Sequence, residues 1–195
     1  MTGGVFHETL GSMSRTTTLT VGDRGFWALN DAFGVWLAYM VEEIERDGGP
    51  EDPWLAALAE QWRVSSAITD FDADLTLDAP EQTPRIRAYA VAARRAAVNA
   101  GDITVRRLQH WMILPDIPVA DGFSRTGDRV EVDRVLEVAD AFIALLNGNF
   151  PPDPPTGAWF LGTGDGMRVI DYRKKPLPGE SRFPRGRTDE NPGRR

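Results

Sequence analysis

A run of evenly spaced carboxylates between two predicted helices has the residue types and the spacing that could hold a metal ion. Asp70, Asp72 and Asp74 fall at positions 1, 3 and 5 of a calcium-binding loop, and Asp78 and Glu81 fall at positions 9 and 12. Carboxylate oxygens are the donors that Ca²⁺ prefers, and this spacing can bring them around one ion. The pattern makes this segment a candidate calcium site.

The same segment alternates between apolar and polar residues. Phe71, Ala73, Leu75 and Leu77 are separated by single polar residues, which is the period of a half-buried strand. In addition, Leu75 fills position 6 of the calcium pattern, where the loop turns and glycine is usual, at a cost of about 1–2 kcal/mol. We therefore expect an extended segment with an acidic outer face, and we keep the degenerate calcium loop as an alternative.

The glycines of the GTGDG sequence at 162–166 are of the kind that cradle phosphate groups. Such loops need a helix directly after the glycines, whereas residues 167–171 continue as a strand pattern. A tight turn with positive φ explains these glycines without a ligand. Asp165 and Arg168, at the rim of the turn, are weak candidates for contact with a ligand or partner.

His110 is one of two histidines and lies in a predicted helix, and the chain has no cysteine. The lack of cysteine excludes disulfides, thiolate nucleophiles and zinc–thiolate sites. A serine–histidine–aspartate triad would depend on His110, and no serine lies in a nucleophile-elbow sequence. We expect no cofactor, and His110 is a candidate for partner contact or for acid–base chemistry.

The strongest predicted element is an amphipathic helix from Phe26 to Asp47. Its large apolar residues recur at steps of three and four, which places them on one buried face. Trp27 lies off that face and is predicted to project as a partner contact. The acidic residues near the end of the helix, Glu42, Glu43 and Glu45, are predicted to form a solvated face.

Four further helices are predicted from cap residues and prolines. They cover residues 52–68, 83–100, 104–112 and 130–147, and two short strands at 158–161 and 167–171 are predicted to pair as a hairpin. The expected fold is mainly α: a single-domain bundle of about five helices with a short C-terminal β-hairpin.

The domain organisation follows from composition. Residues 1–18 are small and polar and are predicted to be a disordered leader, and 173–195 are predicted to be a basic disordered tail. Residues 19–172 are expected to form the folded domain. Within it, Leu19 to Val21 should form a short extended entry, and Asp23 should cap the first helix.

The net charge of −7 is unevenly distributed. Residues 173–195 carry eight Lys or Arg against three Asp or Glu, a balance of +5, so the first 172 residues carry −12. A body this acidic repels nucleic acid and favours basic partners. No apolar run approaches the roughly 20 residues of a membrane span, and the N-terminus has no signal-peptide pattern. We expect a cytoplasmic protein without membrane contact.

Residues 104–108, with Trp111 three positions later, resemble the second helix of a MerR-type helix-turn-helix. That module requires a short first helix, whereas the preceding predicted helix is long and rich in alanine. The acidic body also disfavours DNA. Nucleic acid is therefore not an expected partner.

Two classes of function remain, together with the calcium alternative. The first is a non-catalytic interaction domain, of immunity or inhibitor type, that binds a protein partner through an acidic face. The second is an enzyme of unknown reaction that uses carboxylate, arginine and His110 groups in a cleft between the helices and the hairpin. The oligomeric state is not indicated by the sequence.

Overall fold

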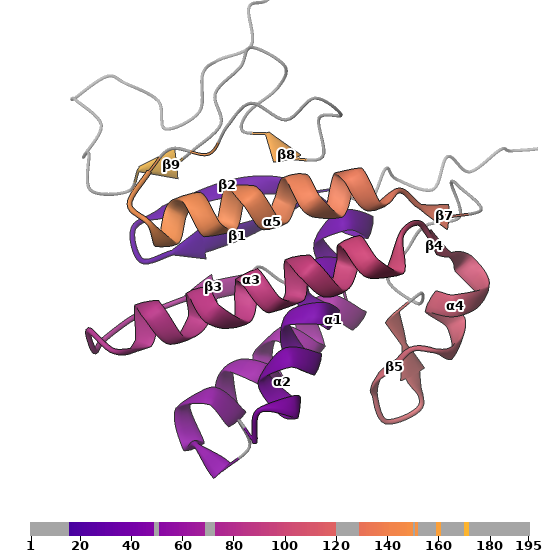
Figure 1. Ribbon diagram of the computed structural model, residues 1–195, viewed down its shortest axis with the longest axis horizontal. Helices are drawn as coiled ribbons and strands as arrows, with labels where there is room; N and C mark the ends of the chain where they lie inside the picture. Colours follow the sequence, from indigo (N-terminus) through magenta and orange to yellow (C-terminus); the bar gives the residue numbers. More distant parts are fainter. Residues whose placement is uncertain are drawn as a thin grey trace, which may run out of the picture.

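The computed structural model describes residues 16–48, 51–68, 73–119, 129–149 and 151, together with the backbone of 159–160 and 170–171. These residues are mainly helical, with five helices and small sheets (Figure 1). The helices are α1 (Asn30–Arg46), α2 (Pro53–Ala67), α3 (Gln82–Ala100), α4 (Val105–His110) and α5 (Val132–Leu146). The strands are β1 (Thr16–Val21), β2 (Arg24–Leu29), β3 (Ala73–Leu75), β4 (Ile103–Thr104), β5 (Met112–Leu114), β6 (Ile117–Pro118), β7 (Arg129–Val130), β8 (Trp159–Phe160) and β9 (Ile170–Asp171).

An N-terminal hairpin precedes the first helix, where the sequence had predicted only a short extended entry. β1 and β2 pair antiparallel around the two-residue loop Gly22–Asp23, in which Gly22 has a φ of 60°. Threonines supply most of β1, and β-branched residues favour strands. Residues 16–18, which were predicted to belong to the leader, lie in β1, and Asp23 lies in the turn and does not cap a helix.

The prediction that the first helix begins at Phe26 is wrong, because residues 26–29 belong to β2 and α1 begins at Asn30. Phe26 is fully buried as a strand residue opposite Leu19. Phe26 continues the three- and four-residue spacing of the large apolar residues that follow, as in a helix, and this spacing led to the prediction of a helix start that is too early. From Asn30 onward the helix is confirmed, and α1 ends at Arg46. The expectation of a single buried face is wrong for residues 32–41, because all of them are buried.

β3 confirms the alternation interpretation of the acidic segment for the part that the structure describes. It pairs in parallel with β1, with Leu19 beside Ala73 and Val21 beside Leu75. Ala73 and Leu75 are buried and Asp74 is exposed. The sheet order is β3–β1–β2–β8, and β9 also pairs with β2.

The two C-terminal strands lie inside the predicted segments, and each of them pairs with β2. β8 pairs antiparallel with Trp27 and Ala28 of β2, and β9 pairs antiparallel with Arg24 and Gly25. Both strands therefore add to the free edge of β2. A hairpin between them is not shown, and the GTGDG turn lies outside the described residues.

The helices pack around α1. This helix contacts α2, α3 and α5, and α5 also lies across β1 and β2 (Figure 1). Three fully buried aromatic residues join these elements: the Phe142 ring meets Trp36 and Trp62 edge-on, each at a centroid distance of 6.1 Å. Burial of large side chains contributes roughly 1.5–3 kcal/mol each, so this cluster is central to stability.

The helix-start prediction at Asp52–Pro53 is confirmed. The Asp52 carboxylate accepts hydrogen bonds from the backbone N–H groups of Trp54 and Leu55, at 3.0 and 3.4 Å, which satisfies amides that the helix leaves unpaired. α1 and α2, which follow one another in the chain, also pack against each other. Within the described residues, no helix has both the length and the apolar character needed to cross a membrane.

Candidate functional site

The predicted acidic segment does not form a metal cluster in the part that the structure describes. The Asp74 carboxylate accepts a hydrogen bond from the Thr20 hydroxyl at 2.5 Å, and this contact ties β3 to β1. Asp78 and Glu81 are exposed on the connection to α3. Among the described residues, no group of three or more histidine, aspartate or glutamate side chains could hold a metal ion.

Four of the other predicted site residues lie outside the described residues: Asp70, Asp72, Asp165 and Arg168. Trp27 is described, but the prediction that it projects from a helix is wrong. It lies on β2, half-buried, between Thr18 of β1 and Phe160 of β8. Its backbone pairs with a neighbouring strand on each side.

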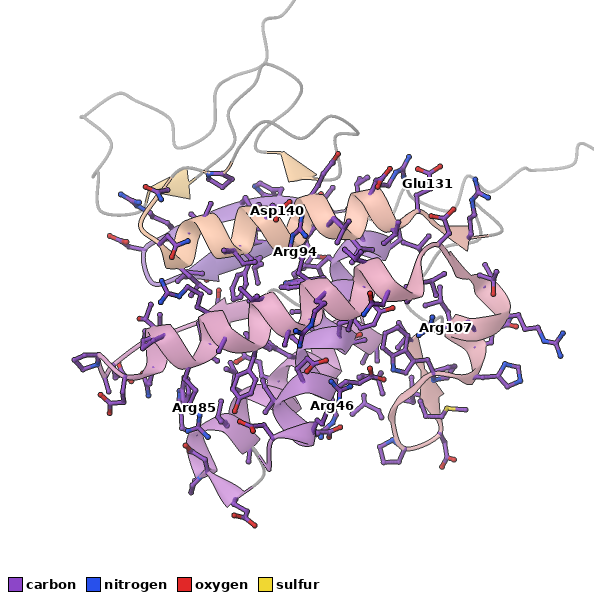
Figure 2. The ribbon with its side chains drawn as sticks, in the orientation of Figure 1. Arg46, Arg85, Arg94, Arg107, Glu131 and Asp140 are labelled. Carbon is purple, nitrogen blue, oxygen red and sulfur yellow. The ribbon has the colours of Figure 1, made fainter. Side chains whose placement is uncertain are left out.

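His110, by contrast, lies in a hollow on the described surface, which we call the α4 hollow. The hollow has a volume of about 540 Å³ and is broadly open to solvent. Its lining comes from α1 and from the α4 region: Glu42, Thr104, Arg106, Arg107, His110 and Trp111. Figure 2 shows Arg107 on α4, at the opposite end of the view from Arg85.

Short local structure holds α4 in place. The Thr104 hydroxyl accepts a hydrogen bond from the Arg107 backbone N–H at 3.3 Å and so caps the helix. β4, directly before α4, pairs with β7. After α4 the chain turns back through the small β5–β6 hairpin, where Asp116 has a φ of 63°. The segments directly before and after α4 are therefore both held by strand pairing.

An edge-on contact between two aromatic rings connects the hollow to the core. The Tyr39 ring of α1 meets the Trp111 ring edge-on at a centroid distance of 4.8 Å. The Arg107 guanidinium carbon lies 5.7 Å from the centroid of the Trp111 ring, which is a cation–π distance. Tyr39 is buried and Trp111 is half-buried, so the hollow has a rigid aromatic wall.

The arginines of the hollow differ from most others in the described residues. Six arginines elsewhere form ion pairs with acidic side chains: Arg46, Arg63, Arg85, Arg94, Arg129 and Arg134. Arg94 of α3 and Asp140 of α5, for example, face one another and form two hydrogen bonds of 2.6 and 3.1 Å (Figure 2). Arg106 and Arg107 form no ion pair with a described residue. Both side chains are exposed at the hollow, and the Arg107 charge also acts on Glu42 and Tyr39.

Glu42 is the acidic residue of the lining, and the prediction that it belongs to a solvated face is wrong. It is half-buried, and burial raises the pKa of its carboxyl above the ordinary value of 4.5. A hydrogen bond from Trp111 and the positive charges of Arg46 and Arg107 lower the pKa, the negative charge of Glu43 raises it, and the net shift is upward. The neighbouring Glu43 is buried as well, in an ion pair with Arg46.

The Tyr39 hydroxyl is enclosed, and it makes no hydrogen bond of ordinary geometry with a described residue. Burial raises the pKa of Tyr39, and the nearby Arg107 guanidinium lowers it by a smaller amount. A buried hydroxyl without a good partner costs free energy. The packing of Tyr39 in the aromatic wall therefore leaves its hydroxyl without a good hydrogen bond, which costs free energy.

The His110 ring has a defined orientation. Its Nδ1 lies 2.7 Å from the Arg106 carbonyl oxygen. Because a carbonyl oxygen can only accept, Nδ1 must carry the proton, and Nε2 of the neutral ring is then an acceptor. His110 therefore offers one ring nitrogen to a ligand in the hollow.

Only part of this site could be found in the sequence. His110 was a candidate, and the nearby spacing of Arg106, Arg107 and Trp111 on a short helix was a visible signal. Glu42 and Tyr39 lie more than sixty residues earlier in the chain, and no local pattern connects them with α4. Their role depends on the packing of α1 against the segment that follows α4.

Comparison of the chain with protein-family models, with curated proteins and with solved structures gave no match. The functional argument therefore depends on the site itself.

Proposed function

We propose that the protein is a non-catalytic interaction domain that binds a protein partner at the α4 hollow, in a role of immunity or inhibitor type. The observation that carries this proposal is the combination of the Tyr39–Trp111–Arg107 stack with two arginines that lack an ion pair among the described residues. Tryptophan, tyrosine and arginine are the residues that most often dominate binding energy at protein interfaces. Met112, the residue after Trp111, is 60% exposed, and methionine is also enriched at interfaces.

The acidic face expected from composition remains part of the proposal as a second contact surface. Much of the negative charge near the α1–α2 connection is engaged within the chain: Glu45 pairs with Arg63, and Asp52 pairs with Arg85. Glu60 also pairs with Arg63, and both Glu60 and the nearby Glu51 are exposed. Because neutralised carboxylates attract a basic partner less strongly, we place the main contact at the α4 hollow.

The test is affinity capture followed by titration. The full chain, immobilised, is exposed to a lysate of its source, captured proteins are identified by mass spectrometry, and each is purified and titrated against the chain. We expect one stoichiometric partner whose affinity falls at least about tenfold with Arg106→Glu, a loss of about 1.4 kcal/mol. Arg95→Glu, on an exposed arginine of α3, is the matched control and should bind normally.

Two outcomes would contradict this placement. If no purified candidate binds the full chain, the interaction role is rejected. If Glu51→Lys and Glu60→Lys release the partner while Arg106→Glu does not, the acidic face and not the α4 hollow is the binding surface.

A specific observation favours one alternative, an enzyme that uses the same hollow. Glu42, whose pKa burial raises, and His110, with Nε2 free to accept a proton, both line it. A carboxyl group and an imidazole in one hollow could perform general acid–base chemistry. Turnover of chromogenic esters, phosphoesters or glycosides that is lost in both Glu42→Gln and His110→Gln would support the enzyme over the interaction domain.

A further inference from the structure

We propose that the α4 hollow recognises an acidic peptide segment of the partner, with a carboxylate held by Arg106 and Arg107 and an adjacent apolar side chain packed on Trp111. This inference rests on the proposed interaction function and assigns the chemistry of the bound group.

Charge complementarity is the first argument. At neutral pH the lining carries two arginines against one carboxyl group, Glu42, on a body that is otherwise acidic. Arginines elsewhere in the described residues mostly meet a carboxylate of the same chain, whereas Arg106 and Arg107 do not. The planar guanidinium donates in a fork that matches a carboxylate. A carboxylate from another chain would form an ion pair with these two arginines, as Asp140 does with Arg94.

The aromatic wall is the second argument. Trp111 is half-buried and held by Tyr39 on one side and by Arg107 on another. A ring fixed in this way loses little conformational entropy on binding. It can therefore pack against an apolar side chain that lies next to the carboxylate in the peptide.

The shape of the hollow favours a peptide over a small ligand. Sites for small molecules enclose most of the ligand surface, whereas this hollow is broadly open. Arginine pairs bind phosphate as well as carboxylate groups, so inorganic phosphate is one arm of the experiment below.

The experiment measures fluorescence anisotropy of a labelled peptide in which glutamates flank a leucine, with a glutamine-for-glutamate peptide as its counterpart. The full chain is compared with the double variant Arg106→Gln/Arg107→Gln. The double variant Arg87→Gln/Arg95→Gln on α3 removes the same charge at exposed positions outside the hollow and is the matched control. Circular dichroism and thermal melts establish that each variant is folded.

We expect saturable binding of the acidic peptide to the full chain and to the α3 control. Loss of both hollow arginines, or of the peptide glutamates, should weaken binding by at least about tenfold. Trp111→Leu should weaken the binding of the leucine-containing peptide more than the binding of a peptide in which serine replaces that leucine. Inorganic phosphate at a matched concentration should not displace the peptide.

Other results overturn the inference. Equal weakening by the α3 control would show non-specific attraction, and complete displacement by phosphate would assign the arginines to a phosphate group. No binding of the acidic peptide, with partner capture still lost in Arg106→Glu, would reject the acidic segment and leave the interaction function standing. Absence of both peptide binding and partner capture would reject both proposals.

Discussion

Tyr39 and Tyr89 are both buried tyrosines whose hydroxyl groups meet different surroundings. The Tyr89 hydroxyl donates to the Asp47 carboxylate at 2.9 Å, whereas the Tyr39 hydroxyl has no partner of ordinary geometry among the described residues. Removing a buried polar group that lacks a partner is close to neutral or stabilising, and removing a bonded one costs about 1 kcal/mol. The two residues form a matched pair for mutation.

We predict that Tyr39→Phe changes the free energy of unfolding by between zero and about 1 kcal/mol in the stabilising direction. Tyr89→Phe should destabilise by about 1 kcal/mol. Urea unfolding of both variants beside the parent protein measures the two values. A larger loss for Tyr39→Phe than for Tyr89→Phe would show that the Tyr39 hydroxyl has an effective partner after all.

Glu42 gives a pH dependence whose sign is fixed by its environment. Burial raises the pKa of Glu42 in the folded state. At pH values between the unfolded and the folded pKa, the folded protein therefore holds a proton that the unfolded chain releases. The contribution of Glu42 to stability is therefore complete below the unfolded value of about 4.5, and it is lost as the pH rises through the higher folded pKa.

Glu42→Gln should remove this pH dependence. The stability of the variant minus that of the parent should increase from pH 4.5 upward and become constant at higher pH. Urea unfolding across this range gives the difference, and Glu51→Gln at the exposed start of α2 is the control. A difference that does not change with pH, or that falls as the pH rises, contradicts the raised pKa.

At the scale of elements, the β1–β2 hairpin depends on two glycines for different reasons. A Cβ on Gly25 would lie 2.8 Å from the Leu19 carbonyl oxygen and 2.8 Å from Cγ2 of Thr20. Gly22 has open space around it but a φ of +60°, a conformation that asparagine tolerates better than most residues. Gly25 is therefore needed because a larger residue has no space there, and Gly22 is needed because of its backbone conformation.

Gly25→Ala should therefore destabilise the protein by about 1–3 kcal/mol, because the neighbouring strand must shift. Gly22→Asn should cost no more than about 1 kcal/mol. Thermal and urea unfolding compare the two variants. Equal stability of Gly25→Ala and the parent would mean that β1 and β2 do not approach as closely as the structure shows.

This hairpin also shows where sequence patterns were insufficient. The threonine-rich run and the Gly22–Asp23 pair are hairpin signals, but the period from Phe26 into α1 favoured a helix, and tertiary pairing with β1, β8 and β9 decided otherwise. Helices bounded by strong caps, such as α2 after Asp52–Pro53, could be predicted because their signals are local. The partners of short strands could not, because pairing depends on distant segments.

At the scale of the whole molecule, one aromatic cluster joins three helices. Phe142 of α5 is fully buried between Trp36 of α1 and Trp62 of α2. The sequence predicted all three helices, and the predicted burial of the large apolar residues is confirmed for Trp36. It could not predict the α4 hollow, because the hollow depends on how α1 meets the segment that follows α4.

Phe142→Ala should lower the free energy of unfolding by about 3–5 kcal/mol, because it leaves a cavity at the junction of the helices. Phe142→Leu keeps much of the volume and should lose less. Tryptophan fluorescence and far-ultraviolet circular dichroism, followed through urea unfolding, should give coincident transitions in the parent protein. Separate transitions would show that α1, α2 and α5 do not share one cooperative core.

The most direct test of the α4 hollow follows tryptophan indole N–H signals by nuclear magnetic resonance. The chain has six tryptophans, and Trp111→Phe identifies the Trp111 signal by its disappearance. On addition of the glutamate–leucine peptide, we predict a saturable shift of the Trp111 signal, while the buried Trp36 and Trp62 signals stay in place. A Trp111 signal that does not move at saturating peptide, or saturable shifts confined to other tryptophans, would contradict recognition at the α4 hollow.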